Sequence, residues 1–516
     1  MSDLQRAIDE LPLRFKGPGG AVAVVKDGAV VARQAWGYAD LARHLPFTPR
    51  TLFPICSITK QFTCATLLDR LGDPSFLDAA LAARLPLLRD KPPRVRDLCH
   101  NQSGLRDYWA LTVLCGAKPE GEFRPADART LMGATRSLHF PAGERYSYSN
   151  GNFRLISDLI EGHAGRPFAE ILAERILRPA GMETARLNPE TGDIPGGGVG
   201  YEGDNGFGFI PAVNRINWTG DAGIVAALDD MIAWERFIDA TRDDADGLYR
   251  RLSAEPSFTG GAAARYGFGL AHMKSAGVKL TGHGGALRGW RSQRLHAAAE
   301  RLSVVVLFNH EASAHEAAFE VLRAALGQKK TPKPAVAYDA GWTGAYHDLD
   351  TDLLLDISPE REKGQVAARF AAKAELLDLA GASEASSPDA TLRREGDIVH
   401  MVRPGENLSV TARRVAGTAP LDITGAFHSH EINADFHITT QGSALFGSFE
   451  GFLGRGAAQS LYPVGAELWR MPCQRSMDSY APGDWTLHFE RDSAGKVSAV
   501  TVGCWLARKV RFEKRT

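Results

Sequence analysis

The chain has 516 residues, of which 44% are hydrophobic and 23% are charged. This length is too great for one ordinary core, so we expect a large domain followed by one or two smaller ones. The composition excludes a disordered or collagen-like chain. Because 60 Lys and Arg residues balance 61 Asp and Glu residues, no net field favours nucleic acid or an anionic membrane, and neither partner is predicted.

The N-terminal segment and the cysteines predict the compartment. Residues 1–16 mix charged and apolar residues at helical spacing and lack the apolar core of a secretory signal, so we expect a surface helix there. No later stretch approaches the roughly 20 apolar residues that cross a bilayer. The six cysteines form no Cys-x-x-Cys pair and suit reduced thiols. We therefore expect a cytoplasmic protein whose cysteines, Cys56 included, are structural.

Strand and helix patterns follow one another in the first part of the chain. Residues 21–25 and 29–35 are rich in β-branched residues and flank Lys26-Asp27-Gly28, which indicates an antiparallel hairpin. Residues 57–71 have apolar positions near helical spacing, and Gly72 is placed to end that helix. Strands at both ends of a helical middle predict an α+β domain. The further helices are expected at 152–163 and 229–241, and the further strands at 265–272 and 302–309.

The composition changes at residues 327–334, where lysine and proline accumulate and predict a linker. Beyond it, Trp342-Thr343-Gly344-Ala345-Tyr346-His347 is echoed 81 residues later by Ile423-Thr424-Gly425-Ala426-Phe427-His428. Each copy precedes a stretch of alternating residues, at 352–357 and 434–439. We therefore expect a catalytic domain over 1–328, a first antiparallel β-barrel over 335–417 and a second over 418–516.

Ser57 and Lys60 are three residues apart, which on a helix places the hydroxyl and the amine on one face. Acyl transfer needs a deprotonated hydroxyl, and a lysine in a low-dielectric cleft loses its proton readily enough to assist. A helix N-terminus also directs backbone N–H groups toward developing negative charge. The same spacing recurs in Ser493–Lys496, but that copy lies between two strand-like runs and is expected to be a solvated turn.

Two further segments, residues 148–150 and 283–285, indicate a function only when they are considered together with Ser57 and Lys60. In Tyr148-Ser149-Asn150, an asparagine follows a tyrosine by two positions, which happens at no other tyrosine of the chain. Alone, this segment could simply pack a ring and cap a helix. His283-Gly284-Gly285 follows a strand-like run, and its glycines permit close approach of the backbone to a ligand. Alone, His283 is more readily structural than functional.

In this order, the three segments resemble the signatures of the penicillin-recognising serine hydrolases, a family that includes β-lactamases, penicillin-binding proteins, esterases and D-aminopeptidases. The resemblance covers residues 17 to about 326 and implies a β-lactamase-like catalytic domain. The chain departs at the third signature, where His283-Gly284-Gly285 replaces the usual Lys-Thr-Gly. Losing that cation and hydroxyl disfavours a carboxypeptidase or a β-lactamase. The His-x-Gly variant followed by two barrels is similar to the D-aminopeptidase branch over nearly the whole chain.

The resemblance implies an acyl-enzyme mechanism. Ser57 would attack the carbonyl carbon, while Lys60 and Tyr148 would move the proton between the nucleophile and the leaving amine, and which of the two is the base stays open. The oxyanion hole would combine the backbone N–H groups of Ser57 and Ala286. Preference for D-residues and a homodimer also follow from the resemblance alone.

His283 is the fourth expected catalytic residue, and Asn150 and Asp478 are expected to bind substrate. Asn150 would orient the substrate amide, and a neutral His283 would hydrogen-bond Tyr148 or the substrate without repelling an ammonium group. An aminopeptidase must also bind the free α-amine, and Asp478, in the loop 474–478, would provide a carboxylate if that loop enters the cleft. A solvated turn is an equally weighted interpretation of this loop.

No metal site and no cofactor are predicted. His310 and His315 are five residues apart and cannot share one helix face, as a zinc-binding His-Glu-x-x-His helix requires. The substrate is expected to be a small peptide or an amino-acid amide. The competing hypotheses are an esterase or D-amino-acid amidase of the same family, or a non-catalytic sensor that is acylated at Ser57 and turns over poorly.

Overall fold

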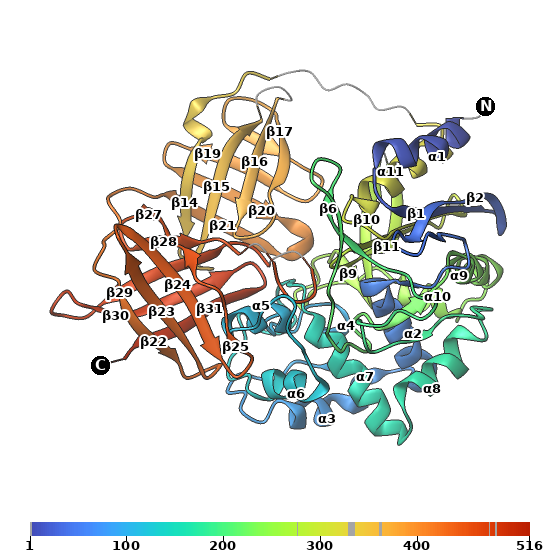
Figure 1. Ribbon diagram of the computed structural model, residues 1–516, viewed down its shortest axis with the longest axis horizontal. Helices are drawn as coiled ribbons and strands as arrows, with labels where there is room; N and C mark the ends of the chain where they lie inside the picture. Colours follow the sequence, from blue (N-terminus) through green and yellow to red (C-terminus); the bar gives the residue numbers. More distant parts are fainter. Residues whose placement is uncertain are drawn as a thin grey trace.

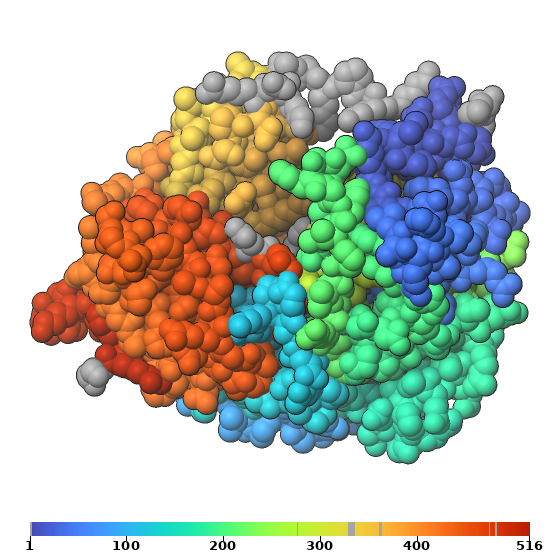
Figure 2. Space-filling model, in the orientation of Figure 1, coloured from blue at the N-terminus to red at the C-terminus, as the bar shows by residue number. Residues whose placement is uncertain are grey.

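A computed structural model describes residues 3–275, 277–328, 336–360, 364–473, 475–479 and 482–515. Helices and a large antiparallel sheet occupy the N-terminal part, and two all-β units follow (Figure 1). Figure 2 shows both C-terminal units, in yellow to red, packed beside the N-terminal part, in blue to green. The predicted fold class is confirmed. The predicted linker is described only at Gly327 and Gln328, because residues 329–335 lie outside the described ranges.

An eight-stranded antiparallel sheet in the order β3-β2-β1-β13-β12-β11-β10-β9 forms the centre of the catalytic domain. The predicted hairpin joins β1 to β2, and Asp27 and Gly28 take positive φ angles of 52° and 74° in its turn. Helices α1 and α11 cover one face with apolar side chains (Figure 1). The strands are β1 (Gly19–Lys26), β2 (Ala29–Asp40), β3 (Leu45–Pro46), β9 (Tyr266–Gly267), β10 (Leu270–Ser275), β11 (Val278–Leu287), β12 (Trp290–Ala297) and β13 (Leu302–Phe308).

The helices of this domain carry or support the predicted site residues. Helix α2 begins at Thr59, so Ser57 lies in the preceding 3-10 turn, Cys56–Ile58, rather than in the helix as expected. Gly72 ends α2 with φ 66°, as predicted. The helices are α1 (Asp3–Arg14), α2 (Thr59–Leu71), α3 (Asp78–Arg84), α4 (Val95–Cys99), α5 (Tyr108–Leu114), α6 (Pro125–Gly133), α7 (Asn150–Ala164), α8 (Phe168–Leu172), α9 (Leu228–Ala240), α10 (Leu248–Leu252) and α11 (Ala314–Ala325). Two small sheets complete the domain. One has three strands in the order β4 (Phe53–Pro54), β8 (Ile224–Ala226), β5 (Arg186–Leu187), and the other pairs β6 (Tyr201–Asp204) with β7 (Gly208–Pro211).

The strand expected over 265–272 is wrong as a continuous element. It divides into β9 and β10 around Phe268 and Gly269, both of which have positive φ angles. A Cβ atom on Gly269 would lie 2.5 Å from the backbone carbon of Lys60. The turn between the two strands therefore touches helix α2 directly, and glycine is required because any side chain would push the helix away.

The first C-terminal unit is a closed antiparallel barrel, β14-β15-β16-β17-β18-β19-β20-β21. The second is a half-barrel with the strand order β25-β24-β23-β22-β31-β30-β29-β28-β27, in which β26 also pairs with β24. The barrel strands are β14 (Gly344–Asp348), β15 (Leu353–Glu360), β16 (Gln365–Phe370), β17 (Glu375–Leu379), β18 (Glu384–Ser386), β19 (Thr391–Glu395), β20 (Ile398–Arg403) and β21 (Leu408–Arg414). The half-barrel strands are β22 (Gly425–Ser429), β23 (Ala434–Gln441), β24 (Ala444–Gly451), β25 (Gly454–Arg455), β26 (Gln459–Ser460), β27 (Tyr462–Gly465), β28 (Leu468–Met471), β29 (Trp485–Arg491), β30 (Val497–Cys504) and β31 (Ala507–Lys514).

The repeated segment occupies the same place in both units. Gly344 and Gly425 begin the first strand of each unit with φ 152° and 141°. Tyr346 and Phe427 follow two residues later and are fully buried. A cation of the last strand covers each ring, since the Arg414 guanidinium carbon lies 4.7 Å from the Tyr346 ring centre and Lys514 Nζ 5.6 Å from that of Phe427.

Polar contacts join the barrel to the half-barrel. His347 Nε2 and His488 Nδ1 each lie 2.8 Å from Asp352 Oδ1. Both ring N–H groups point at one carboxylate oxygen, which is the geometry of a hydrogen-bonded cluster between the two units. Asp352 accepts both bonds. Burial, the largest single effect, raises the pKa of Asp352, but the bonds from His347 and His488 outweigh it and lower the pKa to about 2. None of the helices in the described ranges is long and apolar enough to span a membrane.

Candidate active site

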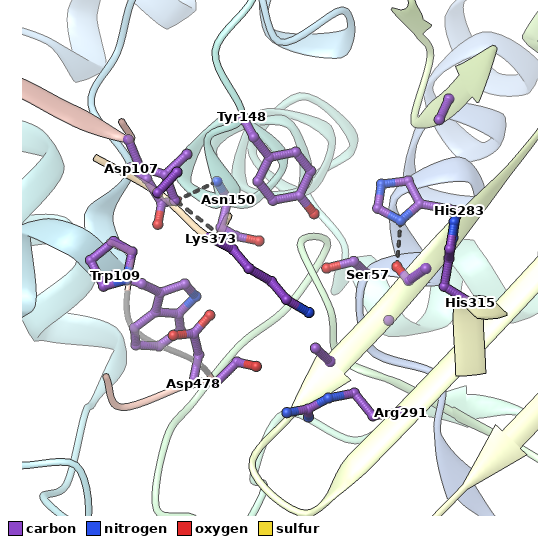
Figure 3. A pocket seen from close by; sticks show the side chains of 18 of the residues that line it. Ser57, Asp107, Trp109, Tyr148, Asn150, His283, Arg291, His315, Lys373 and Asp478 are labelled. Carbon is purple, nitrogen blue, oxygen red and sulfur yellow. Dashed lines mark hydrogen bonds between the residues drawn. The ribbon is translucent and has the colours of Figure 1, made fainter. Parts of the chain in front are cut away.

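Most of the predicted site residues line one cavity of about 650 Å³ at the junction of the three units. Figure 3 shows Asp107 and Asp478 on one side of it and His283 and His315 on the other, with Ser57 facing the space between them. The members of the predicted site that line it are Ser57, Tyr148, Asn150, His283, Ala286 and Asp478. Lys60 lies beneath Ser57 and is fully buried.

The backbone around Ser57 is held against strand β11. Cys56 takes a positive φ of 52°, which is uncommon outside glycine and turns the chain sharply before Ser57. A Cβ atom on Gly285 would lie 2.4 Å from the Ile55 carbonyl oxygen and 3.0 Å from Cys56 Cβ. Glycine at 285 therefore lets the two segments approach, and Ala286 is the next residue along β11. Burial raises the pKa of the Cys56 thiol, which is fully enclosed and stays protonated.

Lys60 has three oxygen atoms around its amine. Its Nζ lies 3.0 Å from Ser57 Oγ, 2.8 Å from Asn150 Oδ1 and 2.7 Å from the Asp221 carbonyl oxygen. Burial is the largest effect on the pKa of Lys60 and lowers it to about 8, against the opposing field of Asp221 and Asp107. Asn150 Oδ1 and a carbonyl oxygen can only accept. A neutral Lys60 therefore keeps both of these bonds and directs its lone pair at Ser57.

His283 is fixed by two hydrogen bonds. Its Nδ1 faces the Gly284 carbonyl oxygen, which only accepts, so Nδ1 carries the proton and Nε2 accepts from the Tyr266 hydroxyl 2.8 Å away. Burial lowers the pKa of His283 to about 3, so the ring is neutral. Nε2 is paired with Tyr266 rather than with Tyr148. The rings of Tyr148 and His283 lie 5.9 Å apart.

Tyr148 lies beside the serine, and its hydroxyl is hydrogen-bonded to Ser57. Burial raises the pKa of Tyr148 well above its usual value, so the hydroxyl keeps its proton. Its ring also faces the amine of Lys60, with 5.0 Å between Nζ and the ring centre. The serine hydroxyl therefore contacts both candidate proton carriers.

Asn150 is oriented by Asp107, a residue that the sequence analysis did not select. Asp107 accepts from the Asn150 backbone N–H at 2.6 Å and from its Nδ2 at 3.1 Å, which turns the amide oxygen toward Lys60. Asp107 in turn donates its own backbone N–H to the Leu506 carbonyl oxygen of the half-barrel at 3.0 Å. Burial, with the nearby Asp478 second, raises the pKa of Asp107 to about 7.

The loop that carries Asp478 crosses from the half-barrel to the cavity. The Arg288 backbone N–H donates to the Asp478 carbonyl oxygen at 2.9 Å, and Met477 is buried in the core. Ser476 Oγ donates to Asp478 Oδ1 at 2.7 Å. Burial raises the pKa of Asp478 to about 6. Within the described part of this loop, 475–479, the side chains are therefore held in place; Gln474 lies outside the described residues.

The remaining candidates lie elsewhere. Ser493–Lys496 forms the turn between β29 and β30, as predicted. His310 is buried against Phe308, and His315 lies in α11 and lines the cavity. Cavity residues that the sequence analysis missed are Asp107, Tyr266 and Lys373. Asp107 precedes a helix and Tyr266 begins a strand, but no sequence pattern at either position assigns it to the cavity.

The comparisons with known proteins agree with this arrangement. A family model described as "Beta-lactamase" matches residues 4–329. The D-aminopeptidase of Brucella anthropi is 53% identical over 514 residues, covering 100% of this chain and 98% of the relative. The chain belongs to the D-aminopeptidase family. The D-aminopeptidase of Brucella ovis is 52% identical, covering 99% of this chain and 98% of the relative. A model described as "D-aminopeptidase, domain B" matches residues 335–513.

Solved structures support the fold of this D-aminopeptidase family member. An octameric penicillin-binding protein homologue from Pyrococcus abyssi has a TM-score of 0.53 at 19% identity, covering 92% of this chain and 98% of the other. D-amino acid amidase from Ochrobactrum anthropi SV3 has a TM-score of 0.52 at 22% identity, covering 63% of this chain and 99% of the other. The predicted membership of the penicillin-recognising serine hydrolases is confirmed.

The contact at Gly285 can be tested directly. We expect Gly285→Ala to push β11 away from the Ser57 turn, because its Cβ would also meet Ser292 Oγ at 2.2 Å. Hydrolysis should fall by about 100-fold, as expected for reacting groups displaced by about 1 Å. Gly260→Ala is the control, since a Cβ there meets nothing within 4 Å. Equal activity of the two variants, both folded by circular dichroism, would contradict this interpretation.

Proposed function

We propose that this protein is a D-aminopeptidase, which removes N-terminal D-amino acids such as D-alanine from peptides, amides and esters through an acyl-enzyme at Ser57. The observation that carries the proposal is the cavity that brings Ser57, above the buried amine of Lys60, together with the carboxylates of Asp107 and Asp478. The relatives named D-aminopeptidase supply the preference for D-residues. The geometry of the site supports the roles assigned below to the base, the proton relay and the carboxylates.

Lys60 is the proposed general base. With its pKa near 8, it has a neutral fraction at neutral pH, whereas burial keeps Tyr148 protonated. Lys60 takes the proton of Ser57 Oγ as that oxygen attacks the substrate carbonyl carbon. The backbone N–H groups of Ser57 and Ala286 then donate to the oxyanion. The sequence left open whether Lys60 or Tyr148 is the base, and this assignment favours Lys60.

Tyr148 is the proposed proton relay to the leaving group. Its hydroxyl is bonded to Ser57 and retains its proton, so it can pass a proton to the departing nitrogen and take one back from Lys60. The carbon–nitrogen bond breaks, the shorter peptide leaves as an amine, and the residue stays as an ester of Ser57. Water then attacks that ester by the same route in reverse. Its proton passes to Lys60, the bond between the carbonyl carbon and Ser57 Oγ breaks, and Lys60 returns the proton to Ser57 Oγ as the amino acid leaves.

Recognition of the free α-amine is assigned to the two carboxylates. Asp478 and Asp107 lie on the same side of the cavity, and an ammonium group between them would relieve their mutual repulsion (Figure 3). Both carboxyls have raised pKa values, about 6 and about 7, which a bound cation would lower. Neutral His283 adds no positive charge that would oppose the amine. Asn150 would orient the substrate amide, as the family resemblance implies.

Two further proposals concern the state of the protein. A homodimer is implied by the family resemblance, and light scattering after size-exclusion chromatography would measure it. A cytoplasmic location is supported by the cysteines, all six of which are free thiols. Cell fractionation tests that location.

The substrate proposal is tested with paired D-alanine and L-alanine p-nitroanilides and with the N-acetylated D-compound. We expect hydrolysis of the free-amine D-substrate alone, because an acetylated nitrogen offers no cation to Asp478. Ser57→Ala should lower that rate by about four orders of magnitude or more. Cleavage of the acetylated compound would favour the esterase interpretation. Stoichiometric labelling of Ser57 without turnover would favour the sensor.

The proposed role of Lys60 predicts a pH profile. Because only the neutral amine accepts a proton, kcat should rise about tenfold per pH unit below the Lys60 pKa and level off above about 8. His283, with its pKa near 3, contributes nothing to this window. Lys60→Arg, which stays charged, should be inactive throughout. A kcat that is flat from pH 6 to 9 would remove Lys60 as the base.

A further inference from the structure

Two arginines and two glutamates form a charged network between the half-barrel and the catalytic domain. Arg475 lies in the loop that carries Asp478. It pairs with Glu120, and its Nε lies 3.4 Å from Glu202 Oε1. Arg288 lies at ion-pair distance from the same two oxygen atoms, with 3.5 Å from Nη1 to Glu120 Oε1 and 3.5 Å from Nε to Glu202 Oε1. Each glutamate therefore lies between two arginines.

The network joins four segments that are distant in sequence. Its members lie between α5 and α6 (Glu120), in β6 (Glu202), in the turn between β11 and β12 (Arg288) and between β28 and β29 (Arg475). Three of these segments belong to the catalytic domain, and the fourth is the loop of the half-barrel. The turn at Arg288 follows directly on the strand that carries Ala286. The network therefore ties the loop to the segment that is assigned to the oxyanion hole.

Arg288 also holds the backbone of the loop. Its backbone N–H donates to the Asp478 carbonyl oxygen at 2.9 Å. Its own carbonyl oxygen accepts from Asn214 Nδ2 at 3.0 Å, and its Nη2 donates to the Val213 carbonyl oxygen. Arg288 is thus fixed on several sides within the catalytic domain, and the two glutamates connect its guanidinium group to that of Arg475.

The two arginines differ in burial. The side chain of Arg288 is 1% exposed and that of Arg475 is 43% exposed. A buried guanidinium group needs counter-charges, and Glu120 and Glu202 supply them to Arg288. Without Arg475, both glutamates still neutralise Arg288, so no buried charge loses its partner. The charge of Arg475 therefore serves the loop and is not needed for the fold of the catalytic domain.

The segment from Arg475 to Asp478 is a compact turn. Ser476 Oγ donates to Asp478 Oδ1 at 2.7 Å. Met477 is buried and packs over Gly121, where a Cβ atom would lie 3.5 Å from Met477 Cε. This apolar contact anchors the loop but is not directional, whereas paired charges fix an orientation as well. A change in the position of Arg475 is therefore passed to the carboxylate three residues later.

We propose that Arg475 is a positioning residue, whose ion pairs with Glu120 and Glu202 hold the Asp478 carboxylate where it meets the α-ammonium group of the substrate. The inference rests on the proposed aminopeptidase function. Asp478 lines the cavity, whereas Arg475, which the structure also describes, does not, so Arg475 acts through Asp478. Loss of the Arg475 charge weakens binding of the amine and leaves the chemistry at Ser57 unchanged.

The test compares D-alanine p-nitroanilide, which has a free amine, with p-nitrophenyl acetate, which has none. We expect Arg475→Gln to raise KM for the anilide about 5-fold, as for a partly exposed group of ion pairs. The kcat for the anilide and the rate on the acetate should stay within about twofold of wild type. Arg475→Lys should keep part of the wild-type affinity, since an ammonium group is charged but lacks the fork that reaches both glutamates.

Arg511→Gln is the matched control. Arg511 lies in the same half-barrel, is 48% exposed and pairs with Glu490 and Glu513, so its substitution removes a similar surface charge that does not touch the loop. This variant should have the wild-type KM for the anilide. An equal rise of KM in Arg511→Gln and Arg475→Gln would contradict a specific role of Arg475.

A double variant shows whether Arg475 acts through Asp478. If it does, Arg475→Gln has no further effect once the carboxylate is gone, and the double variant with Asp478→Asn should match Asp478→Asn alone. Additive losses, equal losses on the anilide and the acetate, or a wild-type KM in Arg475→Gln would overturn the role of Arg475. A wild-type KM in Asp478→Asn would instead overturn the assignment of amine binding, and failure of wild type to cleave the anilide would overturn the aminopeptidase function itself.

Discussion

Burial of the Lys60 amine is the constraint around which the site is arranged. An ammonium group removed from water costs several kcal/mol unless its donors are satisfied. Here Ser57 Oγ, Asn150 Oδ1 and the Asp221 carbonyl oxygen surround it. These three oxygen atoms can satisfy the two N–H groups and the lone pair of a neutral amine, or the three N–H groups of a charged one. With a Lys60 pKa of about 8, the two forms lie close in free energy near neutral pH. Each neighbour must therefore be held in position by something else.

The residues that hold the neighbours of Lys60 in place include contacts with the half-barrel. Asn150 is oriented by Asp107, and the backbone N–H of Asp107 is bonded to Leu506 in the half-barrel. On the other side, the turn at Gly269 touches the backbone of Lys60. The half-barrel thus contributes to the geometry beneath Ser57 as well as to the walls of the cavity. This connection gives a physical reason for a chain in which over a third of the residues follow the catalytic domain.

Site residues that belong to a short sequence motif could be predicted from the sequence. Site residues that reach the cavity through strand pairing or packing between distant segments could not. Ser57 and Lys60 are near neighbours in sequence, so their contact follows from a turn and a helix. The duplicated units were visible because Gly344 and Gly425 impose the same backbone at the same point. Tyr266 reaches His283 only because β9, β10 and β11 pair in one register, and Lys373 reaches the cavity only because Trp505 holds its turn. Such pairings depend on packing between distant segments, which one sequence does not reveal.

The loop at Asp478 also has a consequence for the order of events on the ribosome. Ser57, Lys60, Tyr148 and His283 have all been translated when 195 residues, up to and including Asp478, are still to be added. At the usual speed of translation, this interval lasts roughly 10 to 40 seconds. During it, the nascent chain holds its hydrolytic residues without the carboxylate that we assign to amine selection. Selectivity is therefore acquired late, as the final tenth of the polypeptide emerges and docks.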